Sequence, residues 1–167
     1  MKNIFTIAAA VAFVPALALA APNFTGTWVR DGQNSSTVPN TMYWLTRGVD
    51  AGGARGPGSN ITLEVQQSGS NLTVVDPVEK QRTFMLDGKP YATPTDTGVQ
   101  NATVTSTLSD AALTIVTQQP WGGMPGNVGL TTTKTWTLSA DGRVLTVNTV
   151  RDTPAKRDTY REVFNKR

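Results

Sequence analysis

Residues 130–138, with the sequence LTTTKTWTL, decide the fold class because their side chains alternate between two kinds of position. Threonine occupies every odd position from 131 to 137, and the even positions include Lys134 and Trp136. Successive side chains of a strand point to opposite faces of a sheet, so the alternation predicts a β-strand. The threonine face is too polar to contact lipid, which excludes an outer-membrane barrel.

Similar short runs, rich in Thr, Val and Ile, recur along the chain and are separated by Gly, Asn, Asp and Ser. No stretch after Phe24 has helical periodicity over a dozen residues. Asp87-Gly88-Lys89 and Asp141-Gly142 predict two hairpin turns. The pattern predicts about nine strands, at residues 23–30, 61–66, 72–75, 80–86, 99–108, 112–119, 130–138, 144–150 and 158–166.

Strands that follow one another without intervening helices cannot form a parallel sheet, which needs crossover connections. They form an antiparallel meander, and closing the meander removes its unpaired edges. We therefore expect an all-β fold, an antiparallel up-and-down (meander) β-barrel of about 8–10 strands. A two-sheet sandwich is the alternative.

The N-terminus has the features of a secretory signal peptide. Lys2 precedes an apolar stretch from Ile4 to Leu19, and Ala18-Leu19-Ala20 fits the small-x-small cleavage rule. We expect residues 1–20 to be removed and residues 21–167 to form one domain in the periplasm or outside a bacterial cell. With no cysteine in the chain, neither a disulfide nor a lipid anchor at the cleavage site is available.

The composition also limits the chemistry. The chain has no histidine, which removes the usual general base and the usual zinc ligand. Its glutamates have no spacing typical of a metal site or a glycosidase pair, and Glu64, Glu79 and Glu162 are interpreted as isolated. We expect no catalytic residue, no metal and no cofactor. The formal net charge of +3 does not indicate a nucleic-acid partner.

The opening segment Phe24-Thr25-Gly26-Thr27-Trp28 resembles the Phe-x-Gly-x-Trp start of the calycins, which include lipocalins and fatty-acid-binding proteins. Val163-Phe164-Asn165-Lys166 resembles the closing strand of the fatty-acid-binding branch. As a whole the chain is similar to small exported bacterial lipocalin-like proteins. The resemblance implies that the last strand pairs with the first and that Trp28 plugs the closed end of the barrel.

Two further features follow from this resemblance. Fatty-acid-binding proteins hold a ligand carboxylate with an inward Arg and Tyr on the final strand, where this chain has Glu162 and Phe164, so that clamp is not carried over. Arg161, on the opposite parity, should face outward. In lipocalins an arginine covers the conserved tryptophan, and the candidates to stack on Trp28 are here Arg151, Arg157 and Arg161.

Trp28, Trp136, Phe84, Tyr160 and Phe164 are expected in the core. Two long loops carry the candidate ligand-binding residues, because long irregular segments in small domains are often functional. These residues are Tyr43, Trp44, Arg47, Trp121 and Met124.

The leading hypothesis is an exported barrel that binds a small hydrophobic or aromatic molecule without catalysis. The alternatives are an envelope module with a filled barrel that binds a protein partner, and an isomerase or cyclase that needs neither His nor Cys.

Overall fold

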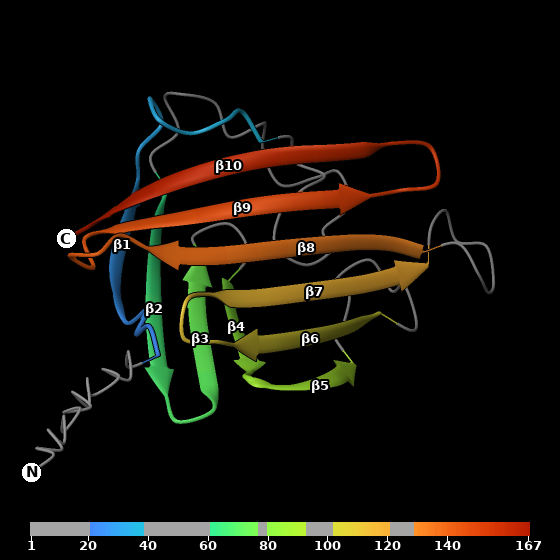
Figure 1. The fold of residues 1–167 in the computed structure, drawn as a ribbon, viewed down its shortest axis with the longest axis horizontal. Helices are drawn as coiled ribbons and strands as arrows, with labels where there is room; N and C mark the ends of the chain where they lie inside the picture. Colours follow the sequence, from blue (N-terminus) through green and yellow to red (C-terminus); the bar gives the residue numbers. More distant parts are fainter. Residues whose placement is uncertain (1–20, 39–60, 77–79, 93–101, 121–128) are drawn as a thin grey trace, which may run out of the picture.

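A computed structural model of the chain describes residues 21–38, 61–76, 80–92, 102–120 and 129–167 (Figure 1). Within these ranges the regular structure is entirely β, and all strand pairs are antiparallel. The ten strands are β1 (Gly26–Arg30), β2 (Thr62–Ser68), β3 (Asn71–Asp76), β4 (Lys80–Met85), β5 (Asp87–Ala92), β6 (Thr103–Leu108), β7 (Leu113–Pro120), β8 (Gly129–Leu138), β9 (Val144–Asp152) and β10 (Arg157–Lys166).

The strands form one sheet in the order β4-β3-β2-β1-β10-β9-β8-β7-β6-β5. The last strand hydrogen-bonds to the first, with Trp28 opposite Lys166 and Arg30 opposite Phe164. In Figure 1 the strands β1–β3 cross β6–β10 at a steep angle, so the sheet folds back over itself. The predicted meander and the predicted pairing of its ends are both confirmed.

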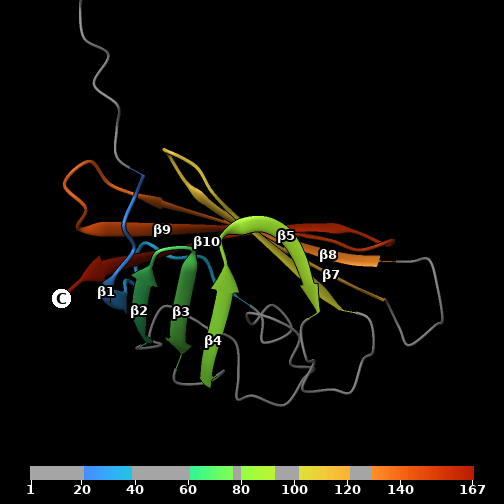
Figure 2. The ribbon, with the colours of Figure 1, turned by 90° about the horizontal axis from the view of Figure 1, so that it is seen from below.

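The barrel is nearly closed by a single bent segment. β4 pairs with β3, β5 pairs with β6, and only Leu86 separates β4 from β5. The Leu86 amide donates to the carbonyl oxygen of Ser70, in the turn between β2 and β3, at 2.7 Å. Figure 2 shows β5 arching from the tip of β4 toward the side of the barrel that carries β7 and β8. The chain therefore changes partner in the middle of one extended run.

The prediction of a hairpin at Asp87-Gly88-Lys89 was wrong. These residues begin β5, and the pairing with β6 shifts register between Asp87 and Pro90. Gly88 has a φ of 73°, a conformation that glycine adopts without strain. An Asp-Gly pair suits a bulge as well as a hairpin turn, because both need a positive φ at the glycine. Here it bends the strand instead of reversing it.

The second Asp-Gly pair forms the predicted turn between β8 and β9. Gly142, with a φ of 68°, donates its amide to the Ser139 carbonyl at 2.8 Å. The Asp141 carboxylate accepts from the Ser139 hydroxyl at 2.6 Å and from the Arg143 amide at 3.1 Å. These hydrogen bonds, the one from Ser139 first, lower the pKa of Asp141.

Large aromatic side chains fill the end of the barrel where the chain enters it. The Trp28 indole donates to the Phe24 carbonyl at 2.9 Å, and the Phe24 ring meets Trp136 edge to face at 5.7 Å between centroids. Apolar residues from β2, β3, β7 and β9 surround them. The largest fully buried side chains of this core are Phe24, Trp28, Leu63, Val65, Leu72, Phe84, Leu113, Ile115, Trp136, Leu145 and Phe164.

The aromatic core predicted from the sequence is confirmed at Trp28, Trp136, Phe84 and Phe164. Tyr160 is the exception, since it is only half-buried. It lies on β10 on the same face as Phe164, but four residues farther from the closed end, where other side chains of that face are polar.

Candidate functional site

The loop residues proposed for ligand contact, Tyr43, Trp44, Arg47, Trp121 and Met124, lie outside the described residues. The structure therefore neither supports nor opposes their role. The candidate site lies on the strands, where the inward side chains of β1 and β6–β10 meet.

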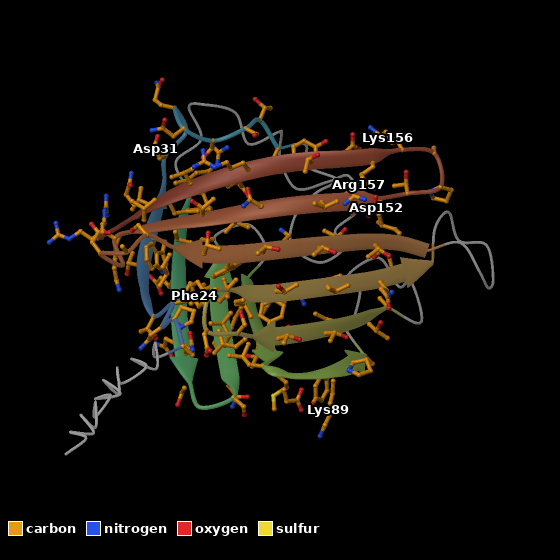
Figure 3. The ribbon with its side chains drawn as sticks, in the orientation of Figure 1. Phe24, Asp31, Lys89, Asp152, Lys156 and Arg157 are labelled. Carbon is orange, nitrogen blue, oxygen red and sulfur yellow. The ribbon has the colours of Figure 1, made fainter. Side chains whose placement is uncertain are left out.

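The inner face of β6–β10 changes character along the strands. Toward the closed end it carries Leu113, Trp136, Val147 and other large apolar side chains. Toward the opposite end the same face carries hydroxyl, amide and charged side chains. In Figure 3, Phe24 lies toward the first end, while Asp152 and Arg157, which flank the turn between β9 and β10 on the outer face, mark the second end. The barrel thus has an apolar half and a polar half.

Six buried polar side chains mark the boundary between these halves, and we call them the polar belt. Each is at most 5% exposed, and they come from six strands that are neighbours in the sheet, β6, β7, β8, β9, β10 and β1. In that order they are Ser106, Thr117, Lys134, Thr149, Glu162 and Arg30.

The strand register explains why these residues form a belt and not scattered polar positions. Lys134 is directly opposite Thr149, and Ser106 lies in the same cross-strand row, with Ile115 of β7 between Ser106 and Lys134. Thr117 lies two residues from Ile115 along β7, on the same face. Strands in a barrel are staggered, so a belt perpendicular to its axis crosses the strands diagonally.

The belt ends in a buried ion pair between the last strand and the first. The Arg30 Nε donates to the Glu162 Oε1 at 3.0 Å, and the two side chains are 0% and 3% exposed. The Arg30 Nη2 also donates to the carbonyl of Ser36 at 2.8 Å. Removing two charges from water is costly unless each is paired and hydrogen-bonded, and this geometry provides both.

Glu162, interpreted as isolated because it has no carboxylate partner at a suitable spacing, has a cationic partner that the sequence analysis did not name. Its inward orientation was predicted from its parity with Phe164, and its burial is consistent with that orientation. The missed partner had a signal in the sequence. Arg30 shares a parity with Trp28, so pairing of the first and last strands brings an inward Arg and an inward Glu to neighbouring rows.

Polar lining continues beyond the belt toward the end of the barrel opposite Phe24. Thr132 and Arg151 are half-buried, and each faces the next in the row that begins at Thr117. Gln119 follows Thr117 on the inner face of β7. Its Oε1 is buried and makes no hydrogen bond within the described part of the chain. A buried side-chain oxygen without a donor is unusual in a folded protein.

The cation over the Trp28 indole is Lys166 and not one of the three arginines expected from the resemblance. Lys166 places its Nζ 5.2 Å from the ring centroid of Trp28. Arg161 is exposed, as its parity predicted, and Arg157 pairs with Asp152. Arg151 is on the inner face of β9, in the polar half of the barrel.

The described residues contain no group of three or more Asp or Glu side chains that could hold a metal ion. The same part of the chain contains no helix long and apolar enough to cross a membrane.

No protein-family model matches the chain, and no curated protein matches it. A solved structure does: the zebrafish ileal bile acid-binding protein complexed with cholic acid, at 17% sequence identity and a TM-score of 0.53. The match covers 86% of this chain and 98% of that one. The fold is calycin-like. At this identity the likeness concerns the fold, and it confirms the architecture implied by the Phe24–Trp28 segment.

Within a calycin-like barrel, the polar belt offers groups that can hydrogen-bond to a small molecule. It offers hydroxyls that both donate and accept, the ammonium donors of Lys134, and the Arg30–Glu162 pair. All of these groups face the interior next to an apolar floor. Such a surface can orient a bound molecule by hydrogen bonds, which is the usual role of a few polar groups in an apolar site.

Proposed function

We propose that this protein is an exported calycin-like barrel that binds a small hydrophobic or amphipathic molecule in its interior and does not transform it. The observation that carries the proposal is the polar belt, six buried polar side chains on the inner face of six neighbouring strands. The calycin-like fold supports it, since the zebrafish neighbour was solved with cholic acid.

Filling a barrel with buried polar side chains costs folding free energy. A buried polar group that loses its water costs about 1–3 kcal/mol unless a partner replaces that water. Val or Leu at Ser106, Thr117 or Thr149 would close the interior without this cost, as they do nearer the closed end. A belt of polar groups at this level therefore favours binding over a purely structural core.

Export is part of the proposal and has its own support. The fold starts directly after the expected cleavage site: the Gln67 side chain donates to the Pro22 carbonyl at 3.2 Å and accepts from the Phe24 amide at 3.0 Å. Residues 1–20 match the pattern of a signal peptide. Expression in a bacterial host, followed by fractionation and N-terminal sequencing, should give a periplasmic or secreted chain that begins at Ala21. A cytoplasmic chain retaining Met1 would contradict this.

Binding can be tested with an environment-sensitive dye, 8-anilinonaphthalene-1-sulfonate, on the mature protein. We expect saturable fluorescence enhancement and about tenfold weaker binding for Lys134→Met, because the dye's sulfonate would lose a charge-assisted hydrogen bond. The control is Lys156→Met, which removes an exposed ammonium at the turn between β9 and β10. A folded protein that binds neither the dye nor extracted lipids would contradict the proposal and favour the filled-barrel interaction module.

A further inference from the structure

We infer that cleavage after Ala20 has to precede folding, because the folded barrel holds the chain almost directly after the scissile bond. The inference rests on the export part of the proposed function and adds the order of the two events. A precursor that folds before it is cut keeps its apolar stretch from Ile4 to Leu19. The order of cleavage and folding therefore decides between a released chain and one that retains its signal peptide.

The side chain of Gln67 holds the start of the mature chain with both polar atoms of its amide group. Its Nε2 donates to the Pro22 carbonyl at 3.2 Å, and its Oε1 accepts from the Phe24 amide at 3.0 Å. The backbone amide of Gln67 also donates to the Thr25 hydroxyl at 3.0 Å. These hydrogen bonds to one residue of β2 fix residues 22–25, and they begin at the second residue after the expected cleavage site.

The burial of Phe24 makes this segment part of the aromatic core. The Phe24 side chain is fully buried, and its ring meets Trp136 edge to face at 5.7 Å between centroids. The Phe24 carbonyl accepts from the Trp28 indole at 2.9 Å. Moving residues 22–25 away from the barrel therefore exposes a large apolar ring and breaks buried hydrogen bonds. Because both changes cost free energy, the open state is rare in the folded protein.

The scissile bond lies too close to this fixed segment for a protease to bind around it. Proteins that bind extended peptides contact the peptide backbone over several residues. In the folded chain, Ala21 is the one residue between the scissile bond and Pro22, whose carbonyl is the first fixed group. Cleavage then requires residues 22–25 to open first. Its rate follows the population of the open form when closing is faster than cleavage.

The test gives folded precursors, residues 1–167, to purified bacterial signal peptidase in detergent. Electrophoresis and N-terminal sequencing follow cleavage, and tryptophan fluorescence confirms that each precursor is folded. The reference precursor carries about eight Gly and Ser residues inserted between Ala21 and Pro22, a flexible linker that separates the scissile bond from the fixed segment. We expect cleavage after Ala20 in this reference, and cleavage at least about a hundredfold slower in the wild-type precursor.

The contribution of the Gln67 side chain is measured with Gln67→Ala. Losing its two hydrogen bonds raises the open population, so this variant of the wild-type precursor should be cleaved about tenfold faster. The matched control is Gln66→Ala, at the neighbouring exposed position of β2, which should change the rate by less than about twofold. In the linker precursor, Gln67→Ala should leave the cleavage rate unchanged, because the scissile bond is already accessible.

Two outcomes overturn the inference and leave export standing. One is a folded wild-type precursor that is cut as fast as the linker precursor, and this comparison holds even if Gln67→Ala fails to fold. The other is equal cleavage rates for folded Gln67→Ala and Gln66→Ala. No cleavage after Ala20 in the linker precursor contradicts the expected signal peptide, and the export part of the proposed function then fails together with this inference.

Discussion

Lys166 and Trp28 are directly opposite each other in the β1–β10 pairing, and the Lys166 ammonium lies 5.2 Å from the indole centroid. The contact joins the last residues of the barrel to the first strand. Trp28 is fully buried while Lys166 is exposed, so the lysine covers the indole from the solvent side. The stem of Lys166 also approaches Gly26 so closely that a Cβ added to this glycine would lie 2.6 Å from the lysine Cε.

Replacing the lysine tests the strength of this contact. Lys166→Met keeps most of the aliphatic stem and removes the cation, and we expect a loss of about 0.5–1 kcal/mol in the free energy of unfolding, the range for an exposed cation–π contact. Urea denaturation of the mature protein measures it. Lys166→Arg should retain the stability, and a Met variant as stable as the wild type would mean that only the stem matters.

Gly26 provides a second, separate test at the same end of the barrel. Its φ of 150° lies in a region that side chains rarely adopt, so Gly26→Ala should destabilise the protein by about 1–3 kcal/mol through backbone strain. The same loss should persist in a Lys166→Ala background, because removing the lysine relieves the contact but not the dihedral. Recovery of stability in the double variant would attribute the effect to crowding.

Titration of the bend between β4 and β5 tests the local hydrogen bonds there. The Tyr91 hydroxyl donates to Asp87 at 2.7 Å and lowers the pKa of that carboxyl below its ordinary 3.8, with smaller help from the Lys89 amide. Since the folded pKa is the lower one, the stabilisation is complete above pH 3.8 and disappears as the pH falls through the folded value. In Tyr91→Phe the pKa of Asp87, followed by NMR, should rise toward 3.8.

An unchanged Asp87 titration in Tyr91→Phe would show that the hydroxyl does not hold the carboxylate in solution. Asp141 is the internal control, because its lowered pKa comes first from Ser139 and should not respond to a change at Tyr91.

The sequence was most informative where burial alternates along one strand. The run 130–138 predicted β8 to within one residue of its observed Gly129–Leu138 bounds, because its buried residues, Leu130, Lys134 and Trp136, all share one parity. The closing of the barrel followed from the same logic, since a long meander has two edges to satisfy. These features depend on local pattern and on general rules of sheets.

The missed features depend on long-range register. The pairing of Arg30 with Glu162 joins residues 132 apart, and the place of Lys166 over Trp28 depends on which residue of β10 faces β1. The bend at Asp87-Gly88 depends on the choice between two partner strands, β3 and β6, which no local pattern specifies. The polar belt depends both on register and on which strands pair. Each of its residues is a single polar position on its own strand, so no local pattern indicates the belt.

Removing one partner of the buried ion pair should destabilise the protein far more than replacing both partners together. Glu162→Gln leaves the Arg30 guanidinium buried with its charge uncompensated, and we expect a loss of about 3–5 kcal/mol in the free energy of unfolding. The double variant Arg30→Met with Glu162→Gln should regain most of this loss, because no charge then remains at that position. Urea denaturation of the three proteins decides the point, and equal losses in the single and double variants would contradict it.

The last prediction separates binding from folding. If the hydroxyls of the belt serve ligand binding, they lower the stability of the ligand-free protein. Removing one of them should then stabilise that form. Thr149→Val replaces a buried hydroxyl, 3% exposed at the residue level, with a methyl group of the same shape. We expect the free energy of unfolding of the ligand-free protein to rise by about 1 kcal/mol, because a buried methyl group does not carry the desolvation cost of a buried hydroxyl. Thr135→Val, on the outer face, should change it by less than about 0.5 kcal/mol. Thermal unfolding of both variants beside the wild type measures the difference, and a destabilised Thr149→Val would mean that the hydroxyl serves the fold itself.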